Sequence, residues 1–511
     1  MDKELKALEE RNTWKIVPIG VARNKAVLTG KWVFCVKTKA DGTIDKFKTR
    51  WVVRGFDQEH GRDFIETFAL VSRHTSLRIL LAIAAMKKKK LRQIDVASAF
   101  LYAPVDAEIF VELPDGSHGE PNQVCQLPKS LYGIKQAPRL WQQYLHARFT
   151  RIGFRQLPHD QGMYRLTKGV GYILLIVYVD DLLYIGSTDN VTTWFEGELQ
   201  KDLALTVSST VTQYLGLNIQ EEENAIHLNA AKYADTIAKR FSLTPTTIST
   251  PYRYTAGSHK EDSAPLKATG IRDYQRKLGC LLFAAVTCRP DLSYSASQLA
   301  TYLKRPEVEH MTELDRALHY LVSTPTIGLT YYKNRTTTPK LIGYVDADHA
   351  GDPNNRRSRT GYIYRLEPIG LISWQSSTQE LIALSSAEAE YIALCLATKE
   401  GLYLRELLEE AKLAQIPSFS LFCDNQSAIR IANKNGFANR TKHIGLRYFF
   451  VKDEIEKGRL ELSYCPTSEM AADYLTKKLG KQMFEYCMLL TRQSHVTSSN
   501  TPEAKGSVGN N

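Results

Sequence analysis

The sequence contains no paired-cysteine motif and no long apolar run. Its eight cysteines are scattered singly, without a C-x-x-C pair or a Cys/His spacing that holds zinc. This usage indicates a reduced, intracellular chain rather than a disulfide-stabilised secreted one. The N-terminal stretch MDKELKALEERNTW is charged and lacks the apolar core of a signal peptide. The longest apolar runs, such as 79–86 and 173–179, are far too short to span a membrane. We therefore expect an intracellular protein without a membrane partner.

Length and charge narrow the class of protein further. A chain of 511 residues exceeds what one hydrophobic core usually supports, so two to four domains are expected. With 43% apolar and 24% charged residues the chain is globular. The excess of 66 Lys and Arg over 55 Asp and Glu gives a net charge of +11, which favours a polyanionic partner. Internal repeats are absent, and we expect residues 481–511 to form a disordered tail.

A basic hairpin is predicted between residues 31 and 54. Two apolar runs flank Asp41-Gly42, a dipeptide typical of hairpin turns. This stretch contains seven Lys or Arg residues against two Asp residues. Such a hairpin suits phosphate binding, and a solvated surface hairpin is the alternative. After a predicted helix, the run KKKKLR either complements the helix dipole or serves nuclear import.

The stretch IVYVDDLLYIG places two adjacent acids within an apolar run that resembles a buried strand. A desolvated carboxylate pair costs several kcal/mol unless a cation compensates it. Asp95 ends another strand-like run, 85 positions before Asp180. Two strand ends that lie side by side would bring Asp95, Asp180 and Asp181 together as hard oxygen ligands, which suit Mg²⁺. A cation is therefore expected at this pair.

A second set of acids lies between residues 341 and 480, where strands and helices alternate as in a separate α/β unit. Asp346 and Asp348 share one face of a strand, and Asp424 ends another apolar run. Ser385 and Glu388 have capping-box spacing at the start of a helix, which leaves Glu390 as the buried acid. Asp473 follows in a late helical segment, where a solvated helix face is the alternative reading.

These motifs resemble the reverse transcriptase and ribonuclease H (RNase H) of copia-type retrotransposons. The polymerase resemblance rests on Asp95-x-x-x-x-Phe100, LPKSLYGIKQAPRLW at 127–141 and Tyr178-Val179-Asp180-Asp181. Further matches are KTRWVVRGFDQEHGRDF at 48–64, YLGLNIQ at 214–220 and CRPDLSYSASQLA at 288–300. The acids between 341 and 480 resemble the RNase H quartet in residue type and order. Together the matches cover residues 14–478, nearly the whole chain.

The resemblance implies a right-hand polymerase followed by an RNase H-like α/β domain, in an α/β and α+β multidomain chain. The implied segments are an N-terminal extension at 1–13, fingers and palm at 14–220, a thumb or connection region at 221–340 and the RNase H-like domain at 341–480. The palm acids Asp95, Asp180 and Asp181 would bind metal. Phe100 would exclude a 2′-hydroxyl, and Gln136 would lie against the nascent base pair. Lys37 and Arg50 would contact the triphosphate.

For the nuclease the resemblance assigns metal binding to Asp346, Glu390, Asp424 and Asp473, with Asp348 as the alternative for the first place. Two Mg²⁺ ions, or Mn²⁺ in their place, are implied at each site. The implied partners are an RNA template, a DNA or tRNA primer, dNTPs and an RNA/DNA hybrid, in a cytoplasmic virus-like particle or the nucleus. The oligomeric state stays open.

Three departures from the family pattern leave a second class of function open. Leu70 replaces a common Pro, Phe449 replaces a common His, and VSTPTIGL at 322–329 replaces a basic, Gly-containing turn. The sequence also has no D-[ST]-G protease motif and no Cys/His cluster of an integrase. The alternative is thus a degenerate or domesticated remnant that binds nucleic acid without catalysis. Another is a ribonuclease H whose polymerase part is only a scaffold.

Overall fold

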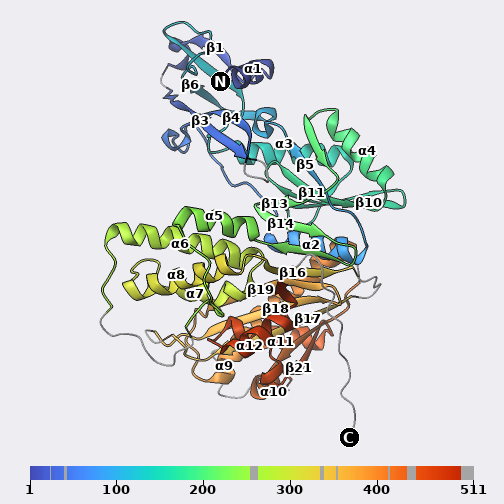
Figure 1. Ribbon diagram of the computed structural model, residues 1–511. Helices are drawn as coiled ribbons and strands as arrows, with labels where there is room; N and C mark the ends of the chain where they lie inside the picture. The colour runs from blue at the N-terminus through green and yellow to red at the C-terminus, as the bar shows by residue number, and fades with distance from the viewer. Residues whose placement is uncertain are drawn as a thin grey trace. The chain divides into compact units, whose positions relative to one another are not determined.

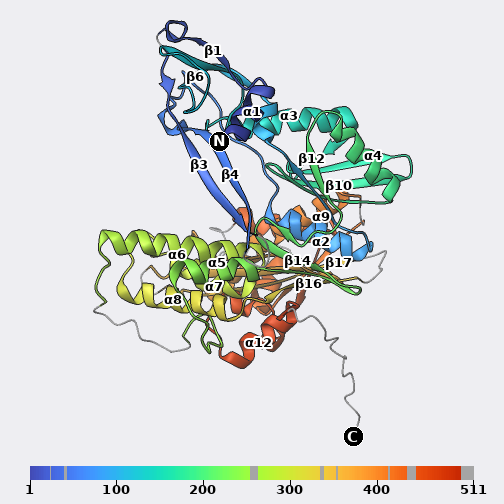
Figure 2. The same ribbon diagram turned by 45° about the horizontal axis from the view of Figure 1, so that its top comes forward.

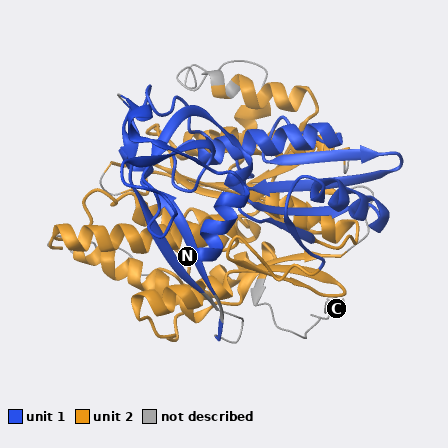
Figure 3. Cartoon of the chain, turned by 90° about the horizontal axis from the view of Figure 1, so that it is seen from above, with its two compact units in different colours: residues 1–73, 92–209 blue, residues 74–91, 210–511 orange. Residues whose placement is uncertain are grey.

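The computed structural model describes residues 1–23, 25–38, 43–253, 263–333, 339–352, 355–412, 415–433 and 445–495. Figure 3 shows its two compact units: unit 1 comprises residues 1–73 and 92–209, and unit 2 comprises residues 74–91 and 210–511. No helix in the described ranges is long and apolar enough to cross a membrane.

Unit 1 combines a small sheet, a two-stranded hairpin and a larger sheet, with strand orders β1-β7-β6-β2, β3-β4 and β12-β5-β11-β10-β9-β8 (Figure 1). Its elements are α1 (Asp2–Glu10), β1 (Lys15–Pro18), η1 (Ile19–Ala22), β2 (Val27–Leu28), β3 (Gly30–Thr38), β4 (Ile44–Val53), η2 (Gly55–Asp57), β5 (Arg92–Val96), η3 (Ala99–Tyr102), β6 (Pro104–Val111), β7 (Gln123–Lys129), α3 (Ala137–Ile152), β8 (Arg155–Gln156), β9 (Met163–Lys168), β10 (Gly171–Tyr178), β11 (Asp181–Gly186), α4 (Asp189–Gln200) and β12 (Leu205–Ser208).

The predicted basic hairpin is confirmed as β3 and β4, which pair in one register from Gly30 with Val53 to Lys37 with Lys46, before a shift at Thr38. Its predicted turn at Asp41-Gly42 lies outside the described residues. Because directly opposite residues share a face, the register separates two kinds of side chain. Val33 with Arg50 and Cys35 with Lys48 lie on one face, whereas Phe34 with Thr49 and Val36 with Phe47 lie on the other. The cations of the hairpin are therefore concentrated on one face.

The larger sheet of unit 1 supports the first acidic set. Strand β5 lies between β12 and β11, and β11 forms a hairpin with β10. The run Ile173–Val177 is buried in the core of this unit, as its apolar, β-branched composition predicts. Trp141, Leu145 and Phe149 of α3 belong to the same core. This packing fixes the strand ends that carry the acids.

Unit 2 contains two five-stranded sheets, ordered β13-β14-β15-β16-β22 and β19-β18-β17-β20-β21. Helices α5, α6, α7 and α8 form a helical layer (Figure 2). The elements are α2 (His74–Met86), β13 (Gln213–Tyr214), β14 (Leu217–Glu221), β15 (Ala225–Asn229), α5 (Ala231–Phe241), α6 (Ala268–Thr287), η4 (Pro290–Leu292), α7 (Ser293–Ala300), α8 (Val308–Ser323), β16 (Ile327–Tyr332), β17 (Lys340–Asp348), β18 (Arg359–Glu367), β19 (Gly370–Thr378), α9 (Ser386–Glu410), β20 (Phe419–Cys423), α10 (Gln426–Asn433), α11 (Gly445–Glu456), β21 (Leu460–Tyr464), η6 (Thr467–Glu469), η7 (Asp473–Leu475), α12 (Lys481–Leu490) and β22 (Gln493–His495).

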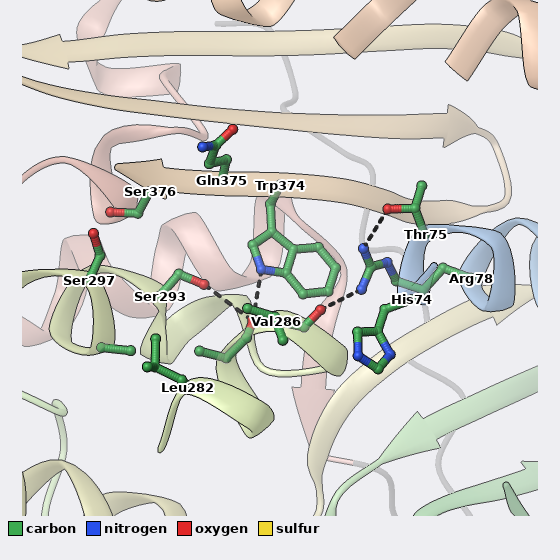
Figure 4. A pocket seen from close by; sticks show the side chains of 12 residues that line it. His74, Thr75, Arg78, Leu282, Val286, Ser293, Ser297, Trp374, Gln375 and Ser376 are labelled. Carbon is green, nitrogen blue, oxygen red and sulfur yellow. Dashed lines mark hydrogen bonds between the residues drawn. The ribbon is translucent and has the colours of Figure 1, made fainter. Parts of the chain in front are cut away.

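Helix α2 belongs to unit 2, although the sequence places it within the expected fingers and palm segment. Its buried Arg78 donates hydrogen bonds to the carbonyl oxygens of Val286 at 2.7 Å, Thr287 at 2.9 Å and Ile372 at 2.8 Å. The guanidinium carbon lies 4.0 Å from the ring centre of Trp374, beside a cavity of about 280 Å³ (Figure 4). These contacts tie α2 to the end of α6 and to β19.

The limits of unit 2 differ from the expected boundaries at 220, 340 and 480. The segments 221–340 and 341–480 form one compact unit because α7 packs on β19 and α2 packs on both sheets. The second sheet begins with three consecutive strands, β17, β18 and β19, before α9, so strands and helices do not alternate strictly as expected. Residues 481–495 are ordered rather than disordered, because Phe484 and Cys487 of α12 are buried and β22 pairs with β16. Residues 496–511 lie outside the described part of the chain.

Candidate active sites

Strand pairing brings the palm acids together. In the antiparallel pair of β11 and β5, Asp181 lies directly opposite Asp95. The backbone N–H of Val96 donates to the carbonyl oxygen of Asp180 at 3.3 Å, and Gln93 Nε2 donates to Asp181 Oδ1 at 3.3 Å. The predicted meeting of two strand ends is therefore present in the fold.

The palm carboxylates are more exposed than the apolar run suggested. Asp180 lies in the turn between β10 and β11, Asp180 and Asp181 are half-buried, and Asp95 is exposed. The expectation of a desolvated pair was wrong, because the turn leaves these carboxylates within reach of water. Among the described residues, they also do not form a group of three whose oxygens lie within 4.8 Å of one another. The structure thus places their backbones side by side without closing a metal-binding cluster.

The turn that carries Asp180 has a strained backbone. Val179 adopts a φ of 56°, a left-handed conformation that is unusual for a β-branched residue. Trp141 Nε1 donates to the Val179 carbonyl oxygen at 2.8 Å and so helps to hold this conformation. Sequence reasoning missed Trp141, whose signal was its position in the LPKSLYGIKQAPRLW motif.

Phe100 and Arg50 both contact the ring of Tyr132. The Phe100 and Tyr132 rings meet edge to face with centres 5.3 Å apart, and the Arg50 guanidinium carbon lies 4.9 Å from the Tyr132 ring centre. Arg50 Nε is buried without a hydrogen-bond partner in the described part of the chain. The backbone of Lys37 pairs with Lys46 in the hairpin, but its side chain lies outside the described part.

Gln136 occupies a different environment from the one expected beside a base pair. It is fully buried at the start of α3. Its Nε2 donates to the Asp63 carbonyl oxygen at 2.9 Å, and its Oε1 accepts from Gln58 Nε2 at 3.0 Å. In this conformation the amide links two loops of unit 1 and has no exposed surface.

The second set of acids converges at the ends of neighbouring strands in unit 2. Strands β17 and β20 are parallel, and Val345 pairs with Cys423. The next residue of each strand segment, Asp346 within β17 and Asp424 just after β20, therefore lies at the same edge of the sheet. Asp473 of η7 and Glu390 of α9 complete the set; Asp346, Glu390 and Asp473 are buried at 2–4% exposure.

Glu388 and Glu390 have separate roles, as the capping-box spacing predicts, although Glu388 caps the Leu384 N–H rather than that of Ser385. Ser385 is the N-cap of α9 and accepts from the Glu388 N–H at 3.2 Å. Glu388 Oε2 accepts from the Leu384 N–H at 2.7 Å, so its carboxylate is used at the helix start. Glu390 instead accepts from the Ala347 N–H beside Asp346.

The acids of unit 2 form two overlapping groups of potential metal ligands. In each group the ligand atoms lie within 4.8 Å of one another: one comprises Glu390, Cys423 and Asp424, and the other Asp346, Asp424 and Asp473. Asp424 is shared, and carboxylate oxygens are the ligands that Mg²⁺ prefers. Asp348 belongs to neither group. Its carboxylate packs so closely on Gly351 that a Cβ added to this glycine would lie 1.9 Å from Asp348 Oδ2. The geometry thus favours Asp346 over Asp348 as the first of the four metal-binding acids.

Burial and mutual repulsion shift the pKa values of this cluster. Burial, with repulsion from Asp346 and Asp424, raises the pKa of Glu390 well above its usual range. Burial and Asp346 raise the pKa of Asp473 to about 7. Burial also raises the pKa of Asp346 and of the Cys423 thiol. The cluster therefore resists full ionisation until a cation compensates its charge.

Four further residues contact the acids and were not predicted. Thr476 Oγ1 donates to Asp346, and Thr467 Oγ1 donates to Asp424 at 2.8 Å. The Cys423 thiol lies 4.0 Å from Glu390 Oε2. Lys477 Nζ lies 3.0 Å from Asp473 Oδ1, four residues earlier in the chain. The i, i+4 spacing of Asp473 and Lys477 was the available sequence signal.

Comparisons with known proteins identify the family. The model of the family described as reverse transcriptase (RNA-dependent DNA polymerase) matches residues 11–253. A putative transposon Ty5-1 protein of Saccharomyces cerevisiae is 33% identical over 310 residues, covering 58% of this chain and 97% of that protein. The chain belongs to the reverse transcriptase family of copia-type retrotransposons.

Longer relatives and a solved structure extend the likeness over most of the chain. The retrovirus-related Pol polyprotein from transposon TNT 1-94 of Nicotiana tabacum is 34% identical over 502 residues, covering 95% of this chain and 37% of that polyprotein. The chain spans about a third of the length of the plant transposon polyproteins it matches.

A foamy viral protease-reverse transcriptase, solved in complex with double-stranded DNA, covers 91% of this chain and 69% of its own, with a TM-score of 0.51 and 14% identity. This likeness concerns the fold alone. The fold is the expected one, a reverse transcriptase polymerase followed by an RNase H-like α/β domain.

Proposed function

We propose that the chain is an RNA-directed DNA polymerase that also degrades the RNA strand of an RNA/DNA hybrid. The observation that carries the proposal is that each unit holds acids at the ends of adjacent strands: Asp95 opposite Asp181 in unit 1, and Asp346 with Asp424 in unit 2. Carboxylates in such places suit two-metal phosphoryl transfer. The metal would be Mg²⁺, or Mn²⁺ in its place, with two ions at each site.

In the polymerase, Asp95 and Asp180 would hold the metal ions, with Asp181 in support. Arg50, on the cationic face of the hairpin, has a buried N–H left to donate and would bind the triphosphate together with Lys37. Phe100 would contact the sugar of the incoming dNTP. Gln136 would act near the nascent base pair only after a change in its side-chain contacts, because its amide is engaged with Asp63 and Gln58. The partners would be an RNA template, a DNA or tRNA primer and dNTPs.

In the nuclease, Glu390, Asp424, Asp346 and Asp473 would hold the ions, and Thr476 and Thr467 would orient two of the carboxylates. Bound ions would polarise the phosphodiester and stabilise the charge that develops during in-line attack by water. The substrate would be the RNA strand of an RNA/DNA hybrid, distinguished from DNA by its 2′-hydroxyls and by duplex shape.

Two assays on the full chain test the proposal: primer extension on an RNA template and hydrolysis of a labelled RNA/DNA hybrid. Asp180→Asn should abolish extension and leave hydrolysis, whereas Glu390→Gln should abolish hydrolysis and leave extension. If the unaltered chain binds nucleic acid but shows neither activity, it is a remnant that binds nucleic acid without catalysis. If only hydrolysis is found, unit 1 acts as a scaffold.

A further inference from the structure

A lysine side chain lies among the acids of the RNase H-like site. Lys477 Nζ lies 3.0 Å from Asp473 Oδ1 and 3.6 Å from Asp346 Oδ2. Both acids are almost fully buried, with side chains 5% and 3% exposed, whereas the Lys477 side chain is 36% exposed. The ammonium thus reaches into the cluster from its solvent side.

The oxygens that Lys477 contacts belong to one of the two metal-ligand groups. Asp346 and Asp473 form that group with Asp424, and their oxygens lie within 4.8 Å of one another. The other group, Glu390, Cys423 and Asp424, has no ion pair to Lys477 among the described contacts. An ammonium and a divalent cation repel each other at such distances, so both cannot use the Asp346 and Asp473 oxygens without loss of affinity.

We propose that Lys477 is the resting counter-cation of the second metal position, and that it must leave before an ion binds between Asp346, Asp424 and Asp473. This inference rests on the proposed nuclease function. The first ion binds on the Glu390 side, where the described contacts include no ion pair of Lys477 to Glu390 or Asp424. The second binds more weakly, because part of its binding free energy displaces the Lys477 ammonium.

The side chain is suited to this exchange. Its flexible four-carbon stem and partial exposure allow the ammonium to move into water without opening the core. The hydroxyl donors to Asp346 and Asp424, Thr476 and Thr467, are neutral and so remain compatible with a bound cation. Lys477 is therefore the group in the described cluster whose charge opposes the second ion.

The test is a calorimetric Mg²⁺ titration of the full chain, in an Asp180→Asn background that weakens ion binding at the polymerase site. Lys477→Gln should tighten the weaker binding step about tenfold or more, because the competing charge is removed. Lys477→Arg, which keeps the charge, should bind the weaker ion as the parent does. The adjacent and exposed Lys478 provides the matched control, and Lys478→Gln should leave both steps unchanged.

Thermal melting gives a second readout that does not depend on activity. Without Mg²⁺, Lys477→Gln should melt at a lower temperature than the parent, since two buried carboxylates lose their counter-cation; with saturating Mg²⁺ the difference should close. An equal or weaker second affinity in Lys477→Gln would overturn the inference. If Asp424→Asn leaves the titration unchanged, no ion binds at these acids and the proposed nuclease site itself fails.

Discussion

Glu388 and Glu390 lie two residues apart on α9 and have unrelated environments. The Glu388 carboxylate accepts a hydrogen bond from the Leu384 backbone at 2.7 Å, whereas Glu390 lies beside the Cys423 thiol and the Asp346 strand end. The first holds the start of the helix in place. The second is a candidate metal ligand, so the two glutamates can be distinguished experimentally.

The glutamine variants of this pair should differ sharply. Glu388→Gln should retain hybrid hydrolysis, because a glutamine oxygen still accepts from the Leu384 N–H, and its melting temperature should change little. Glu390→Gln should lose hydrolysis without unfolding. Hydrolysis rates and melting curves of both variants are the measurement, and an inactive Glu388→Gln beside an active Glu390→Gln would reverse the two assignments.

Phe100 should control the choice between deoxyribonucleotides and ribonucleotides. Phe100→Val should admit ribonucleotides and raise their use relative to dNTPs by roughly tenfold to a hundredfold, because an unpaired 2′-hydroxyl is no longer forced against the ring. Competition between rGTP and dGTP on an RNA template measures the ratio. Tyr132→Phe keeps the edge-to-face partner of Phe100 and serves as the control. An unchanged ratio in a folded Phe100→Val would remove Phe100 from sugar selection.

The metal-free protein should lose stability as the pH rises from the ordinary carboxyl pKa of 3.8 to about 7. Asp473 has a pKa of about 7 in the fold, raised by burial and Asp346 despite Lys477, against 3.8 for the ordinary group. The folded state therefore binds more protons between these values, and its stability decreases as pH increases through that window. Asp473→Asn should show a smaller decrease in melting temperature between about pH 5 and about pH 7.5, and Mg²⁺ should suppress the difference. Parallel curves for both proteins would contradict the shift.

Arg78 should be one of the residues on which the stability of unit 2 most depends. Arg78→Met leaves three carbonyl oxygens without their donor: the buried ones of Thr287 and Ile372 and the part-buried one of Val286. The loss should be about 2–4 kcal/mol in the free energy of unfolding. Denaturant unfolding measures it, with Lys88→Met at an exposed position near the end of the same segment as the control. Equal stabilities of the two variants would contradict this role.

Local patterns were sufficient to predict the elements that carry the acids. Two apolar runs on either side of Asp41-Gly42 predicted the pairing of β3 with β4. Capping-box spacing separated Glu388 from Glu390, which two residues later lies on the opposite side of the helix. The acids of β17 and β20 were identified by type and order, and parallel pairing brought them together.

Features that depend on distant contacts were not predictable. The sequence around Gln136 contains no signal that Asp63 and Gln58 engage its amide. The exposure of Asp180 follows from the strained turn at Val179. That turn is held by a hydrogen bond from Trp141, which lies 38 positions earlier in the chain. Residues 481–495 were expected to be disordered because β16, the partner of β22, lies more than 160 positions earlier in the chain. In each case tertiary packing determines a burial, an exposure or an ordered segment that the local sequence does not specify.

The order in which the chain is synthesised matters for α2. Arg78 is synthesised 294 positions before Ile372, whose carbonyl oxygen it binds. The apolar surface of α2 therefore stays uncovered until most of unit 2 has been synthesised. A fragment that starts at residue 210 would contain β19 and α6 but not the helix that covers them. Separate expression of unit 2 should therefore require residues 74–91 as a second chain or as a graft, and complementation by that short peptide would provide a simple reporter of assembly.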